Sequence, residues 1–228
     1  MQKLLSYNYI YLIPLTLSVV ASLRSFRLAW LKPYRYFALF LITSIMIEIF
    51  AISWKWGLHQ TIFWNFPKSN LWIYNIFLTI QLLFYAGFYY RLITADKIKK
   101  AIRYGILPLA GFGIFNFFYI QSPGVLNSYS IIPYYFTFVI FALVFFHQVL
   151  HDKQIIVLHS HPAIWISLGT FIYYSVSLPF CIFLPYLVSH NPALAFSLFK
   201  INMAFDTLMY SFYLISFLCK PQFLKSAY

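Results

Sequence analysis

Seven apolar stretches, each long enough to cross a bilayer as a helix, fill almost all of this 228-residue chain. A hydrocarbon core about 30 Å thick needs roughly 20 apolar helical residues to span it. Only 9% of the residues are charged, against about a quarter in a soluble domain. We therefore predict an all-α, polytopic membrane protein, a seven-transmembrane-helix bundle in a single domain (residues 1–228), with spans at about 7–22, 36–54, 71–90, 104–120, 131–150, 162–188 and 194–218.

The positive charges lie mainly in every second gap between these stretches. Twelve of the sixteen Lys and Arg residues follow this pattern: Arg24, Arg27, Lys32, Arg35, Arg91, Lys97, Lys99, Lys100, Arg103, Lys153, Lys220 and Lys225. Short cytoplasmic loops carry such an excess. We therefore expect an amino end outside and a carboxyl end in the cytoplasm, in a bacterial inner (cytoplasmic) membrane. The net charge of +12 is expected to attract anionic lipids at the cytoplasmic face rather than nucleic acid.

A cleaved signal peptide is the alternative for the first stretch. Lys3, the apolar run and the small residue Ala21 before Ser22 fit that pattern. We favour a retained span, because cleavage there would export four closely spaced cations just behind the cut, against the charge rule.

Three ionisable side chains fall inside the spans, where an uncompensated charge is costly and by default indicates function. Glu48 lies in the second span, and Lys200 and Asp206 lie in the seventh. At 1.5 Å per residue, Glu48 and Lys200 both lie roughly 9 Å below the outer boundary, and Asp206 lies nearer the midplane. We therefore expect an ion pair between Glu48 and Lys200.

Polar residues also recur at helical spacing within the spans. Asn202, Asp206, Tyr210 and Tyr213 share one face of the seventh span, and Ser167, Thr170, Tyr174 and Ser177 share one face of the sixth. Such faces turn away from lipid, and one explanation is simple hydrogen bonding between helices. The other is a polar pocket in the outer half of the bundle, with the predicted ligand-binding residues Glu48, Asn75, Gln81, Lys200, Asn202 and Asp206.

Four histidines gather at the predicted cytoplasmic ends of the fifth and sixth spans: His147, His151, His159 and His161. Two histidines four residues apart on a helix can share a metal ion. No Glu stands between them, so the zinc-protease motif is absent. We expect loop and interfacial histidines here rather than a metal site, and we predict no cofactor.

Three stretches carry a resemblance to a known group: Ile47-Glu48-Ile49, Asn70-Leu71-Trp72-Ile73-Tyr74-Asn75-Ile76-Phe77 and Ile201-Asn202. With them the chain resembles the small seven-helix integral membrane proteins found in many bacteria. The resemblance implies the seven-helix fold and brings no activity. Microbial rhodopsins differ, because they need an acid in the third span to accompany a lysine such as Lys200 in the seventh.

We predict a receptor-like or sensory membrane protein with an outer ligand pocket and a basic face for a cytoplasmic signalling partner. The sixth span, with Pro179 and Pro185 inside it, is the element expected to switch. A small-solute or proton-coupled transporter is the alternative, with Glu48 and Asp206 exchanging protons. An intramembrane lipid-modifying enzyme is a further alternative, less expected because the chain has no phosphate loop and no serine nucleophile elbow.

Overall fold

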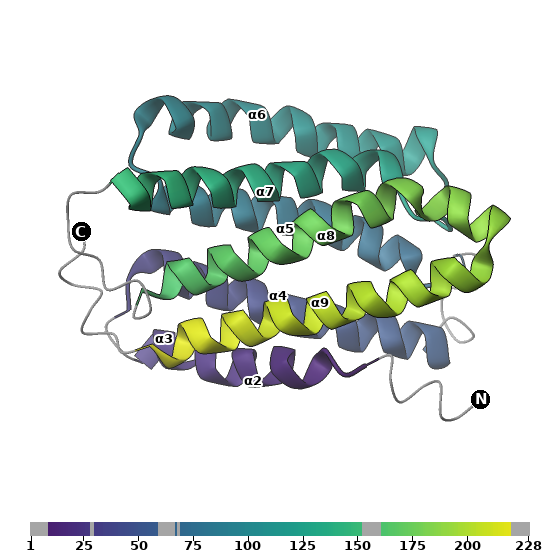
Figure 1. Cartoon of the computed structure of the whole chain (residues 1–228), viewed down its shortest axis with the longest axis horizontal. Coiled ribbons are helices and arrows are strands. Elements are labelled where there is room, and N and C mark those ends of the chain that lie inside the picture. The colour runs from purple at the N-terminus through teal and green to yellow at the C-terminus, as the bar shows by residue number, and fades with distance from the viewer. Residues whose placement is uncertain (1–8, 28–29, 59–66, 68, 152–160, 220–228) are drawn as a thin grey trace.

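The computed structural model describes residues 9–27, 30–58, 67, 69–151 and 161–219. Within these ranges the chain is helical and contains no strand. The helices are α2 (Leu12–Ser22), α3 (Arg24–Arg27), α4 (Lys32–Trp56), α5 (Leu71–Leu92), α6 (Asp96–Phe115), the π-helix η2 (Asn116–Ile120), α7 (Ser128–His151), α8 (Pro162–His190) and α9 (Pro192–Leu218). Long helices that follow one another in the chain run in opposite directions along one bundle axis (Figure 1).

Six helices are long and apolar enough to cross a membrane, counting α6 together with η2. They make this an integral membrane protein with a helical bundle. The first helical segment is shorter than the six spanning helices, because α2 has 11 residues and is followed by the 4-residue helix α3. The span predicted at about 7–22 is therefore a short helix within the described part of the chain, and six helices of spanning length are present there instead of seven.

Proline and asparagine set the beginnings of several helices. Proline stands in the first turn of α4, α8 and α9, where its missing N–H would have no helical partner in any case. At the junction of α8 and α9, the Asn191 side chain accepts a hydrogen bond from the Leu194 backbone N–H at 3.1 Å. This cap lets the chain end one long helix and begin the next with a single residue between them.

Helix α6 begins earlier than the sequence predicts. The hydropathy pattern places its start near residue 104, whereas α6 begins at Asp96. Its first turns carry Lys97, Lys99, Lys100 and Arg103. A helix does not have to end where the hydrocarbon ends, since backbone hydrogen bonds continue in the head-group layer, so the hydropathy pattern underestimates its length.

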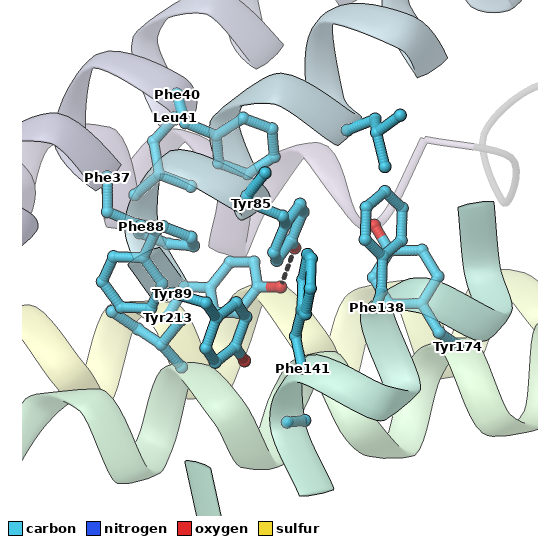
Figure 2. Packing of buried hydrophobic residues seen from close by; sticks show 14 of the residues in the cluster. Phe37, Phe40, Leu41, Tyr85, Phe88, Tyr89, Phe138, Phe141, Tyr174 and Tyr213 are labelled. Carbon is cyan, nitrogen blue, oxygen red and sulfur yellow. Dashed lines mark hydrogen bonds between the residues drawn. The ribbon is translucent and has the colours of Figure 1, made fainter. Parts of the chain in front are cut away.

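A layer of aromatic rings forms the centre of the bundle, shown in Figure 2. The Tyr85 ring of α5 lies 5.2 Å from that of Phe40, 4.6 Å from that of Phe138 and 5.8 Å from that of Tyr174, measured between ring centroids. These rings come from α4, α7 and α8, so one residue of α5 connects three other helices. Its hydroxyl also hydrogen-bonds to that of Tyr213 on α9 (Figure 2).

The polar row of α8 turns into this core. All four members, Ser167, Thr170, Tyr174 and Ser177, are fully buried, which confirms the predicted inward face. Their hydroxyls are partnered: Gln81 donates to Tyr174 at 2.6 Å, Tyr89 donates to Ser167 at 3.1 Å, and Thr170 lies 3.0 Å from the Tyr213 hydroxyl. Hydrogen bonds between α5, α8 and α9 thus satisfy the hydroxyl groups of this row.

Helices α8 and α9 approach closely at Gly169. A Cβ atom placed there would lie 3.1 Å from both the Met209 carbonyl oxygen and Phe212 Cβ. We predict that Gly169→Leu forces the helices apart and lowers the free energy of unfolding by about 1–3 kcal/mol. Thermal unfolding in detergent measures this. Gly111→Leu in α6 is the matched control, because open space surrounds Gly111; equal losses in both variants would contradict the prediction.

Candidate functional site

A cavity of about 420 Å³ lies in the half of the bundle where α4, η2 and α8 end. Side chains from before α2 and from α4, α5, α7, α8 and α9 line it. It extends from Lys55 and Asn70 near the helix ends to Gln81 and Tyr210 deeper in the bundle. This is the half of the bundle in which the sequence predicts a polar pocket.

Glu48 is held in this cavity by two tyrosines. Its Oε2 atom accepts a hydrogen bond from the Tyr11 hydroxyl at 2.8 Å and another from the Tyr74 hydroxyl at 2.9 Å. Hydrogen bonds to a carboxylate are stronger than those between neutral groups. The two donors come from the residue preceding α2 and from α5, so Glu48 on α4 joins three segments at this end of the bundle.

Asp206 lines the same cavity from α9 and is half-buried. No described side chain or backbone N–H donates a hydrogen bond to its carboxyl group. The tyrosines that surround it, including Tyr135, Tyr173 and Tyr210, also line the cavity. A carboxyl group facing an enclosed space without a protein partner is the arrangement that an incoming donor or cation can complete.

The three predicted amide residues also line the cavity, and each has a structural partner. Asn75 donates to the Val125 carbonyl at 2.8 Å and accepts from the Asn127 N–H at 3.2 Å, so it fixes the connection between η2 and α7. Gln81 donates to Tyr174. Asn202 accepts a hydrogen bond from the Ser177 hydroxyl at 2.5 Å. All three amides therefore help to hold the walls of the cavity that they line.

Lys200 does not join this site, and the expected ion pair with Glu48 is wrong. The Lys200 ammonium group is exposed and lies 4.6 Å from the centroid of the Phe196 ring, one turn earlier in α9. It is not among the side chains that line the cavity. A long lysine side chain can place its charge at the surface while its methylene groups follow the helix. Depth along a helix does not determine the direction in which a side chain points.

Tyrosines are the site residues that the sequence reasoning missed. Tyr11 and Tyr74 hold Glu48, and the Tyr11 ring stacks on that of Tyr210 at 6.4 Å. With 20 tyrosines in the chain, no single one stands out. A buried carboxylate without an ion pair needs hydroxyl donors, and tyrosine is the commonest hydroxyl residue in the spans next to Glu48.

Dense packing closes the cavity toward the other end of the bundle. Below Gln81, the side chains of Tyr85 and Tyr89 on α5 are fully buried and hydrogen-bonded to α9 and α8. Phe37 and Phe88 fill the space beside them, with ring centroids 4.9 Å apart. This packing therefore closes the cavity toward the end of the bundle where α9 finishes.

The described cations divide between the two ends of the bundle. Nine of them lie on α3, the first turn of α4, the last turn of α5 and the first half of α6: Arg24, Arg27, Lys32, Arg35, Arg91, Lys97, Lys99, Lys100 and Arg103. These segments lie at the end where α9 finishes (Figure 1). The expected placement of Arg91 and of 97–103 at the same end as the carboxyl terminus of α9 is confirmed.

The histidines form no metal centre in the part of the chain that the structure describes. The rings of His147 and His151 stack with centroids 4.2 Å apart. His161 is buried near the Phe145 ring, and this burial lowers the pKa of its imidazole. His159 lies outside the described residues. No three His, Cys, Asp or Glu side chains in the described ranges come close enough to hold a metal ion.

Comparison with models of protein families, with curated proteins and with solved structures finds no match. The resemblance to small seven-helix bacterial membrane proteins therefore stays a sequence-based prediction. Function has to be argued from the geometry of the cavity and from the charges around it.

The hydrogen bonds from Tyr11 and Tyr74 to Glu48 are expected to stabilise the folded protein. Tyr74→Phe removes one donor from a buried carboxylate, and we expect it to lower the free energy of unfolding by about 1–2 kcal/mol. In a Glu48→Leu background the same change is expected to cost much less, because no acceptor remains. The coupling energy between Tyr74 and Glu48 is measured by unfolding the wild type, the two single variants and the double variant in bicelles. Tyr129→Phe, at an exposed tyrosine, is the control; a coupling energy near zero would show that the hydrogen bond adds nothing.

Proposed function

We propose that this protein is a receptor-like sensory membrane protein that binds a small organic cation in the cavity between α4, α5 and α9. The observation that carries the proposal is the Asp206 carboxyl group, which faces the cavity beside Glu48 and has no described hydrogen-bond donor. Carboxyl groups in a membrane interior need company. A cation in the cavity would supply the Asp206 carboxyl group with a partner of opposite charge, which no described side chain provides.

The aromatic walls favour an organic ammonium ion over a bare metal ion. The faces of tyrosine rings attract cations within about 6 Å of the ring centre. Tyr11 and Tyr210 line the cavity as a stacked pair next to the two carboxyl groups. A ligand with a charged nitrogen and an apolar body would match both kinds of wall, since binding sites are mostly apolar with a few placed polar groups.

The packing below the cavity favours sensing over transport. A transporter must expose its site to each side of the membrane in turn. Here that would require the hydrogen bonds of Tyr85 and Tyr89 to break and the fully buried rings of Phe37 and Phe88 to separate. A receptor needs only a smaller change of helix packing on one side.

Orientation follows from the charges. We place the end with nine described cations in the cytoplasm, because short cytoplasmic loops carry the excess of Lys and Arg, and we place the cavity on the outer side. In this orientation the protein crosses a bacterial inner membrane with its carboxyl end inside. The basic end would lie against anionic lipid head groups and would be available to a signalling partner.

Ligand binding is testable with a simple amine. We expect phenethylammonium to stabilise the purified protein in nanodiscs, whereas the neutral 2-phenylethanol does not. Asp206→Asn should weaken phenethylammonium binding by roughly tenfold or more, because it removes a desolvated charge of nearly unchanged shape. Calorimetric titration measures the affinity.

Lys200→Gln is the control for that titration, since Lys200 is exposed and outside the cavity, and it should leave the affinity unchanged. Equal affinity for the amine and the alcohol would contradict the proposed site. Net flux of phenethylammonium into liposomes, lost in Asp206→Asn, would replace the sensing proposal by a transport one.

Topology is tested separately. Single cysteines at Lys99 and Ser122, in a Cys181→Ala, Cys219→Ala background, mark opposite ends of α6 with η2. A membrane-impermeant maleimide should label position 122 in intact cells and position 99 only after the membrane is opened. The reverse pattern would place the cavity on the cytoplasmic side.

A further inference from the structure

A second hollow of about 440 Å³ lies between the halves of α8 and α9 that meet at Asn191. Pro179, Phe183 and Tyr186 of α8 line it on one side, and Leu198, Ile201 and Asn202 of α9 on the other. Apart from the Asn202 side chain and the Tyr186 hydroxyl, these side chains are apolar. We refer to this hollow as the α8–α9 groove.

The α8–α9 groove opens on the flank of the bundle. Phe183 is 59% exposed, Tyr186 60% and Ile201 51%. Beyond Cys181, α8 has no buried residue. Both helices are of membrane-spanning length, so this flank faces the hydrocarbon, and a molecule in the groove would arrive from the bilayer rather than from water.

Asn202 connects the groove with the cavity, because it lines both. Its Oδ1 atom accepts the Ser177 hydrogen bond across the α8–α9 interface. Asp206 follows one helical turn later on the same face of α9. The Asn202 side chain therefore lies between the apolar α8–α9 groove and the cavity that holds the Asp206 carboxyl group.

We propose that the natural ligand is a single-chain cationic amphiphile, which places its ammonium head group at Asp206 and Glu48 and its alkyl chain in the α8–α9 groove. This inference rests on the proposed function and specifies its ligand class. The charge of the cavity selects the head group, and the apolar groove accepts the chain. The cavity then holds the ammonium group beside the carboxyl groups, and the groove holds the alkyl chain against apolar side chains. Neither hollow alone could accommodate both parts of the ligand.

Filling the groove tests the proposal. Dodecylammonium and butylammonium share a head group and differ in chain length. In nanodiscs of phosphatidylcholine, Ile201→Trp should weaken dodecylammonium binding by about tenfold or more, since overfilling a contact is unfavourable, and leave butylammonium binding unchanged. Leu208→Trp on α9 is the matched control, because Leu208 is 39% exposed and lies outside the groove; it should change neither affinity.

The outcomes separate the two proposals. If butylammonium binds and Ile201→Trp leaves dodecylammonium binding intact, the groove assignment is overturned and the cavity proposal stands. If neither amine binds the wild-type protein, the proposed function fails and the groove assignment with it. Dodecylammonium binding that is the same in wild type and Asp206→Asn would reflect partitioning into the bilayer, which overturns both.

Discussion

The cost of an ionisable group in hydrocarbon governs the arrangement of the half of the bundle that contains Glu48 and Asp206. Glu48 is tolerated there because Tyr11 and Tyr74 both donate to one of its oxygens. The same two hydrogen bonds fix the beginning of α2 and the first turns of α5 against α4. A polar requirement and a packing requirement are thus met by one small cluster, and the cavity forms beside it, where Asp206 on α9 receives no such support.

The two halves of the bundle solve different problems. The half near the basic end is closed by fully buried aromatic side chains, whose hydroxyls pair with one another and with Ser167 and Thr170. The other half leaves two hollows, one polar and one apolar, that share Asn202. One half of the bundle is thus closed by packing and hydrogen bonds, whereas the other contains both hollows.

Hydropathy and spacing predicted much of this, because both report directly on burial. The helical bundle, six of the spans, the inward face of α8 and five of the six proposed cavity residues follow from the residues alone. The prediction for Lys200 was wrong, because sequence position gives depth along a helix but not the path of a long flexible side chain. The shortness of α2 and the early start of α6 were missed because hydropathy does not report where a helix ends.

The segment formed by α2 and α3 connects the two ends of the bundle. Tyr11 immediately precedes α2 and touches the Glu48 carboxylate, while Arg24 and Arg27 stand on α3, at the far end of the same segment. This segment packs along α4 and α9, and the Ser18 and Ser22 hydroxyls donate hydrogen bonds to carbonyl groups of their own helix. Movement of this segment along α4 and α9 would consequently change the surroundings of the Glu48 carboxylate at one end of the bundle and displace the guanidinium groups of α3 at the other.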